Sequence, residues 1–342
     1  METGFFLASN SGKGFYSLYD AFPPEGSFLH IIKGGPGTGK SGFMKRIAAA
    51  AAARGMDTEL IYCSADPDSL DGLYIPTINQ AWMDGTAPHT RDAALFAVDS
   101  DYVNLGAFCR RPLKSADAAR AMELNREYKQ LYASAYKYLA AEAQVANAYE
   151  AEPLEREQLE PLGDMIADII AGEQRGRKKG NGRQSYRFIS AISGSGKLCL
   201  ENTVKKLCKQ NYSFSEPLHA HQLLSLVAQM ARERGLRAIL CPEPLRPDML
   251  EAVLLPELEL CFGRADPEQG RGGLEVSFGR EPRRSNDRQQ EQAIRESLRT
   301  QATARLKQAK KLHDDMEAVY RPYMDFAALD DYTEDCIDSI FK

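Results

Sequence analysis

The chain contains one stretch that decides its fold, Gly34-Gly35-Pro36-Gly37-Thr38-Gly39-Lys40-Ser41. This stretch fills every fixed position of the phosphate-binding pattern G-x-x-x-x-G-K-[ST]. The apolar run 28–32 before it predicts a buried strand, and residues 43–53, which end at Arg54-Gly55, predict a helix with a glycine stop. The pattern requires a strand, a loop and a helix in this order, and we call residues 34–41 the glycine loop.

The glycine loop predicts a binding site for a nucleoside triphosphate, ATP, together with Mg²⁺. Its backbone amides are expected to surround the phosphates, and the N-terminus of the following helix adds a partial positive charge. Lys40 is expected to reach the β- and γ-phosphates, and the Ser41 hydroxyl to bind Mg²⁺. The predicted nucleotide-binding residues are Gly35, Pro36, Gly37, Thr38, Gly39, Lys40, Ser41 and Gly42.

Asp84 is the predicted acidic partner of the metal. It follows the apolar run 78–83, which predicts a strand, and folds of this class place an acid at the carboxyl end of such a strand. The alternative is that Asp84 only forms a turn before Gly85. The next residues, Gly85 and Thr86, include no glutamate that would polarise water, so the sequence does not promise fast hydrolysis.

The residue that would activate water is left open by the sequence. Asp66, Asp68 and Asp71 lie in a predicted loop at the crevice, and we take Asp68 as the catalytic candidate, with an Asx-type turn as the alternative. Further polar candidates near the site, none singled out by spacing, are His89, Arg91, Arg110 and Arg111.

The composition is that of an ordinary globular protein of 342 residues, with 43% apolar and 27% charged residues. The net charge of −5 gives no general attraction to nucleic acid. No apolar run is long enough to span a membrane, and Met1-Glu2-Thr3-Gly4 lacks the features of a signal peptide, so we expect a cytoplasmic protein. The seven cysteines show no C-x-x-C pair and are expected to be reduced thiols.

The chain also contains an internal repeat. Residues 54–76 align without gaps on residues 234–256 at an offset of 180, sharing Arg-Gly, four further positions and the final proline. Ser9, Ser11, Gly12 and Lys13 match Ser193, Ser195, Gly196 and Lys197 at an offset of 184. The second copy reads 216-EPLHAHQL-223 where the first has the glycine loop, so it is predicted to lack a phosphate site, and the cluster 193–197 is a decoy because Leu198 and Ala191 break the pattern.

Two helical arms and a linker complete the predicted organisation. Helical spacing over 115–170 predicts a helical hairpin inserted after the nucleotide core, and 286–320 repeats the design, with core packing favoured over a lid or a docking arm. Residues 172–186 are glycine-rich and basic and predict a flexible linker, with a nucleic-acid patch as the alternative. The predicted domains are therefore 1–171, with the glycine loop, and 187–342.

With these motifs in view, the chain resembles an uncharacterised family of bacterial P-loop ATPases, found chiefly in Firmicutes, over nearly its whole length. The matching features are the glycine loop, the segment 66-DPDSLDG-72, the segment 84-DGTAPH-89 and the duplicated halves. The resemblance implies a P-loop NTPase fold, a three-layer α/β/α sheet duplicated in tandem. In that family both halves usually carry a phosphate loop, and this chain departs from the pattern in its second half.

These observations predict Mg²⁺-dependent ATP hydrolysis by the first half, coupled to a change in conformation or in the binding of a protein or small-molecule partner. The alternatives are a kinase that transfers the γ-phosphate to a small molecule or nucleotide, and a nucleotide-gated binding protein with negligible turnover. The missing glutamate after Asp84 keeps the kinase alternative open.

Overall fold

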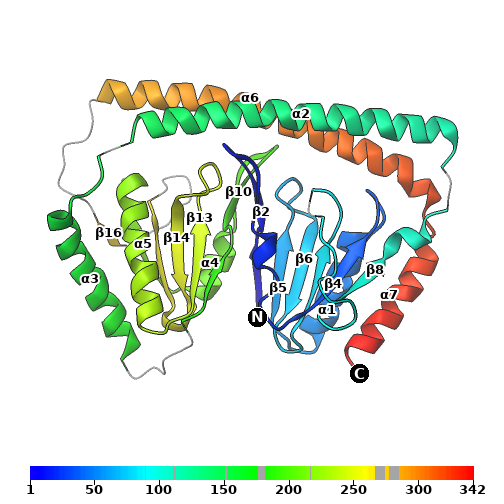
Figure 1. Cartoon of the computed structure of the whole chain (residues 1–342), viewed down its shortest axis with the longest axis horizontal. Helices are drawn as coiled ribbons and strands as arrows, with labels where there is room; N and C mark the ends of the chain where they lie inside the picture. Colours follow the sequence, from blue (N-terminus) through cyan, green and yellow to red (C-terminus); the bar gives the residue numbers. More distant parts are fainter. Residues whose placement is uncertain are drawn as a thin grey trace.

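The structure is a computed structural model, which describes residues 1–88, 90–110, 113–150, 152–175, 182–215, 217–265, 274–276 and 285–342. It is a mixed α/β structure with two six-stranded sheets and two short hairpins (Figure 1). No helix within the described residues is long and apolar enough to cross a membrane.

The first sheet has the order β1-β5-β6-β7-β4-β8. Only β6 runs antiparallel to its neighbours, and the other pairs are parallel. Helix α1 (Lys40–Ala53) follows β4 through the glycine loop, as predicted. The strands are β1 (Glu2–Phe5), β4 (Phe28–Lys33), β5 (Thr58–Tyr62), β6 (Leu70–Ile75), β7 (Gln80–Asp84) and β8 (Ser100–Asn104).

The second sheet repeats this topology in the order β9-β13-β14-β15-β12-β16. Even a register irregularity recurs, between Ile61 and Tyr62 in the first half and between Cys241 and Pro242 in the second. The predicted duplication at an offset of 180 is thus confirmed for three strands of the second sheet, β13, β14 and β15, which follow β5, β6 and β7 at that offset. The strands of the second sheet are β9 (Gln184–Tyr186), β12 (Gln210–Phe214), β13 (Ala238–Pro242), β14 (Leu250–Leu255), β15 (Leu260–Arg264) and β16 (Leu274–Val276), and α5 (Pro217–Glu233) follows β12.

Each half also has a β-hairpin, and the matching positions of the two hairpins show that the predicted offset of 184 is wrong. In β2 (Ala8–Ser11) and β3 (Gly14–Ser17), the Ser11 hydroxyl donates to the Gly14 carbonyl. In β10 (Ser190–Ser193) and β11 (Gly196–Cys199), Ser193 donates in the same way to Gly196. The two glycines have positive φ, 89° and 96°, which a tight turn requires. The correct offset is 182. The cluster 193–197 forms a hairpin turn between β10 and β11, which agrees with the prediction that it is not a phosphate loop.

The two halves meet at a pair of equivalent residues. Phe6 and Phe188 exchange two backbone hydrogen bonds of 2.9 Å, and they are related by the same offset of 182. Around this bridge, the inner faces of both sheets form one apolar core, to which β4 contributes Leu29 and Ile31 and β14 contributes Ala252 and Leu254. The same core contains Val204 of α4 (Glu201–Leu207), so this helix and the first half together cover the inner side of the second sheet. The expected three-layer α/β/α arrangement stays a prediction.

The helical arms cross between the halves. Helices α2 (Ser115–Ala148) and α6 (Ser285–Tyr320) lie side by side over both sheets (Figure 1). After them, α3 (Arg156–Gln174) of the first half packs on α5, and α7 (Phe326–Ile340) of the second half packs on α1. Each terminal helix thus covers the sheet of the other half.

This crossing corrects two predictions. The helical hairpin predicted within 115–170 is wrong, because α2 pairs with α6 rather than with α3. The predicted domains 1–171 and 187–342 do not coincide with the units in space, because α3 and α7 belong to the core of the opposite half. The predicted linker 172–186 is shortened by α3, which ends at Gln174, and by β9, which begins at Gln184; residues 176–181 lie outside the described residues.

Short connecting helices complete the chain and help to position these elements. The first half has two 3₁₀ turns, η1 (Tyr19–Ala21) and η2 (Leu105–Phe108). The second half has α4 (Glu201–Leu207) after its hairpin, η3 (Pro256–Leu258) between β14 and β15, and η4 (Arg321–Tyr323) between α6 and α7. Asp325 caps α7 by accepting a hydrogen bond from the Ala328 amide, so the chain turns sharply from α6 into α7.

The exchange of terminal helices leads to a stability prediction. Ile166 of α3 is fully buried against the second half, whereas Ile294 of α6 is 38% exposed. We expect Ile166→Ala to lower the free energy of unfolding by about 2–5 kcal/mol because it leaves a cavity. Ile294→Ala is the matched control, with an expected effect within about 0.5 kcal/mol. Urea unfolding measures both, and equal effects would contradict the packing of α3 in the second core.

Candidate nucleotide-binding site

The glycine loop joins the carboxyl end of β4 to the N-terminus of α1, in the context that the sequence predicted. Gly37 and Gly39 have φ of 69° and 85°, in the left-handed region that favours glycine. The Thr38 hydroxyl donates to the Gly35 carbonyl over 2.9 Å and closes the loop on itself. The backbone thus takes the tight curve that a chain needs in order to direct successive amides at one anion.

Lys40 and Asp84 lie together at the carboxyl ends of the neighbouring strands β4 and β7. The Lys40 ammonium donates to the carbonyls of Gly34 and Gly35 over 3.1 and 2.9 Å and lies 3.6 Å from Asp84 Oδ2. Asp84 ends β7, which pairs in parallel with β4 so that Asp84 stands opposite Ile32. The strand order, which the sequence left open, therefore places the acid on the strand next to the loop.

The Asp84 carboxylate is held in a fixed orientation. Its Oδ1 atom accepts from the Thr86 amide over 2.9 Å and from the Thr86 hydroxyl over 2.6 Å. This is the Asx-type turn that the sequence offered as an alternative role. The turn occupies one carboxylate oxygen, while the other faces Lys40, so forming the turn and facing the site are compatible.

Ser41 lies at the start of α1 and accepts a hydrogen bond of 2.9 Å from the Leu70 amide. A hydroxyl oxygen has two lone pairs, so Ser41 can accept this bond and still offer an oxygen to a cation. Magnesium prefers oxygen ligands, and the hydroxyl of Ser41 and the carboxylate of Asp84 fit this preference.

The aspartates after β5 do not all lie where the sequence predicted. Asp71 belongs to β6 rather than to a loop, and it is only 8% exposed. Asp66 accepts from the Ser69 hydroxyl over 2.9 Å and forms a turn. Asp68, the predicted catalytic candidate, is exposed, and its backbone carbonyl accepts from Lys45 of α1. Asp71 and Asp66 are therefore better enclosed than Asp68.

The other polar candidates either bind neighbouring backbone groups or fall outside the described residues. Arg91 donates to the carbonyls of Tyr19 and Phe22, so it holds the chain around η1. Arg110 donates its backbone amide to the Tyr323 carbonyl over 2.8 Å, beside η4. His89 and Arg111 fall outside the described residues.

The sequence missed that helix α6 of the second half covers the glycine loop. A Cβ atom on Gly37 would lie 3.1 Å from the Glu317 carbonyl oxygen, and one on Gly35 would lie 3.6 Å from the Tyr320 ring. A Cβ on Gly39 would lie 2.8 Å from Leu329 of α7. Glycine is thus needed here for close helix packing as well as for backbone conformation. The helical pattern of 286–320 was visible in the sequence, but its partner was not.

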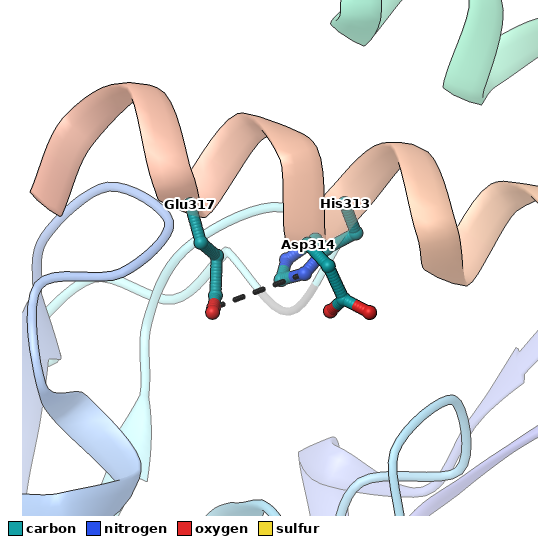
Figure 2. Close-up of side chains that lie close together, drawn as sticks. All are labelled: His313, Asp314 and Glu317. Carbon is teal, nitrogen blue, oxygen red and sulfur yellow. Dashed lines mark ion pairs between the residues drawn. The ribbon is translucent and has the colours of Figure 1, made fainter.

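In the turns of α6 that lead up to the Glu317 contact, the helix carries a group of polar side chains. Figure 2 shows His313, Asp314 and Glu317 projecting from the same side of α6, and a line joins His313 Nδ1 to Glu317 Oε1, which are 3.8 Å apart. The ligand atoms of these three residues lie within 4.8 Å of one another. Lys310, one turn earlier, reaches Asp66 Oδ2 over 3.5 Å and also pairs with Asp314.

The second half has replaced the same site with internal ion pairs. His221 stands at the position of Ser41 and accepts from the Leu250 amide over 3.0 Å, just as Ser41 accepts from Leu70. Arg264 stands at the position of Asp84 and lies 3.2 Å from Glu243 Oε1. Arg246 pairs with the same Glu243 over 3.0 Å. Charges of the chain itself therefore fill this region, and no glycine loop follows β12.

Glu243 is an acid whose pKa is set by these neighbours. Burial by itself would raise the pKa of Glu243, but Arg264 and Arg246, with Lys197 beyond them, lower it below its usual value. The carboxylate is 5% exposed, so its charge is stabilised by ion pairs instead of water.

Comparisons of the chain with protein-family models, with curated proteins and with solved structures found no match.

The ion pairs of the second half lead to a pH prediction. Because the pKa of Glu243 is lower in the folded chain than in the unfolded one, its stabilisation is present above about pH 4.5 and is lost as the pH falls further. We expect Glu243→Gln to cost about 3–5 kcal/mol of the free energy of unfolding at pH 7. Urea unfolding from pH 7 to pH 3 should show this difference shrinking in acid, and a constant difference would contradict the assignment.

Proposed function

We propose that the first half binds ATP with Mg²⁺ and hydrolyses it, and that this turnover drives a change in the arrangement of the two halves or in a bound partner. The observation that carries the proposal is the pairing of Lys40 with Asp84 on the strand beside the glycine loop, at 3.6 Å. The two side chains are 13% and 14% exposed, so their charges lie in a partly enclosed place where electrostatic interactions are stronger than in water.

The proposed chemistry is mainly electrostatic. Lys40 and the loop amides neutralise the negative charge of the β- and γ-phosphates. Ser41 and Asp84 hold Mg²⁺, which when bound spreads the charge of the phosphate oxygens. Water then attacks the γ-phosphorus as the bond to the bridging oxygen breaks, which yields ADP and phosphate. The candidates to take the proton from water are Asp71, which is 8% exposed, and the more exposed Asp66 and Asp68 in the turn before it.

Transfer of the γ-phosphate to an acceptor is the second candidate. It is favoured by the sequence after Asp84, where Thr86 binds the carboxylate and no glutamate stands to polarise water. It is also favoured by the cover that α6 provides, because a covered crevice protects a phosphate from water during transfer. A nucleotide-gated binding protein with negligible turnover is the third candidate, and it predicts bound but unconsumed ATP.

The first experiment measures phosphate release and ATP binding for the wild type and for Lys40→Ala at equal ATP and Mg²⁺. We expect the variant to bind ATP about ten- to a hundredfold more weakly, because it loses a charged hydrogen-bond donor to the phosphates, and to release no phosphate. Unchanged ATP affinity in this variant would contradict the site. Binding without phosphate release in the wild type would favour the kinase or the gated binding protein.

Lys197→Ala is the companion prediction for the second half. Lys197 lies on the hairpin strand β11, 3.6 Å from Glu251, and not in a phosphate-binding loop. We therefore expect ATP affinity to remain within about twofold of the wild type, as measured by the same titration. A loss comparable to that of Lys40→Ala would show that the second half takes part in nucleotide binding.

A further inference from the structure

Lys310 is a cation of the second half that reaches into the first. It lies on α6, and its ammonium is 3.5 Å from Asp66 Oδ2, in the turn between β5 and β6. Asp314, one helical turn later, pairs with the same ammonium. The Lys310 and Asp66 side chains are 31% and 29% exposed, so water reaches the pair and the contact can break at modest cost.

The same face of α6 touches the glycine loop. Glu317 follows Lys310 by seven residues, which places the two on one side of the helix and about 10 Å apart along its axis. The backbone of Glu317 packs on Gly37. Helix α6 therefore contacts the turn between β5 and β6 through Lys310 and the loop after β4 through Glu317.

Lys310 therefore lies beside the turn that carries Asp66, and the Leu70 amide directly after this turn donates to Ser41 of the glycine loop. In the proposed site, Lys40 reaches the β- and γ-phosphates while Ser41 and Asp84 hold Mg²⁺, so the terminal phosphate would lie beside Ser41 and the turn that contacts it. A lysine has three donors on a flexible four-carbon stem, so it can move from a carboxylate to a nearby phosphate without a change in the backbone. A terminal phosphate also carries more negative charge than the single carboxylate of Asp66.

In the second half, the residue that corresponds to Asp66 also forms an ion pair with the arm of the first half, but this pair is held by further bonds. Arg246 occupies the position of Asp66 at the offset of 180, and it pairs with Glu150 at the end of the first half's own arm. Here the turn supplies the cation and the arm supplies the acid, and the side chains of Arg246 and Glu150 are 8% and 22% exposed. Arg246 is further bound to Glu243 and to Asn147. The half without a glycine loop thus has a buried, multiply bonded clamp where the half with the loop has an open pair.

We infer that Lys310 leaves Asp66 when the site fills and binds the terminal phosphate of the nucleotide, so that the second half completes the site of the first. This inference rests on the proposed function, since it needs a triphosphate on the glycine loop. It assigns α6 the task of distinguishing a triphosphate from a diphosphate. It also supplies the coupling in the proposed function, because α6 spans both halves and moves its charge only for the triphosphate.

The test compares the affinity of Lys310→Met for a non-hydrolysable ATP analogue with its affinity for ADP, both with Mg²⁺, by calorimetric titration. We expect the analogue to bind about ten- to a hundredfold more weakly than to the wild type, because a charged donor to its terminal phosphate is lost. ADP lacks that phosphate and is expected to bind as before. The ADP titration also shows that the variant is folded, so a merely structural role of Lys310 would not give this pattern.

Lys311→Met is the matched control, because Lys311 is the next residue of α6 and is exposed. Its two affinities are expected to match those of the wild type. Equal effects of Lys310→Met on both nucleotides, or no effect on either, would overturn the inference while the proposed function stands. Failure of the wild type to bind either nucleotide would instead overturn the proposed function, and the inference with it.

Discussion

The two halves share one apolar core, and the rest of the structure depends on it. Each sheet alternates along its strands, so that Leu240 and Val253 pack with α5 and α3 while Ile239 and Leu254 pack in the core shared with the first half. A sheet with two apolar faces must cover both of them. Only the short helix α4 among the described α-helices contributes to this shared core, through Val204, while α1 and α5 pack in the separate cores of the outer faces. The arms can then cross from one half to the other.

Because the arms cross, each half contributes a helix to the core of the other, although the charged groups at the corresponding sites differ. The half with the glycine loop has glycines that allow close packing of Glu317 and Leu329, and a lysine and an aspartate 3.6 Å apart. The other half has exchanged the corresponding positions for His221 and Arg264, and its charges are satisfied by Glu243. Ion pairs of this buried kind cost desolvation and fix one geometry. The second half therefore holds its charged groups in buried ion pairs, and its helix α6 lies over the glycine loop of the first half.

The long helices α2 and α6 pack against each other and connect the two halves. Glu142 of α2 receives two hydrogen bonds of 2.6 Å from Arg299 of α6, which joins the C-terminal part of α2 to the middle of α6. A Cβ on Gly194 would lie 2.8 Å from the Lys307 backbone, so α6 also packs tightly on the hairpin of its own half. Helix α6 thus contacts the glycine loop of one half and the hairpin of the other through close packing.

The sequence by itself determined the local features: the glycine loop between a strand and a helix, Asp84 at a strand end, and the repeat at an offset of 180. These follow from spacing and backbone preference, which act over a few residues. It also placed the cluster 193–197 outside the phosphate pattern, although it set the offset of the hairpins two residues too far. Tertiary structure alone decided that β7 lies beside β4, that α3 and α7 exchange partners, and that Glu317 and Lys310 lie over the site. A helix pattern gives the apolar face of 286–320 but not the surface that covers it, because the partner is chosen by packing between residues hundreds of positions apart.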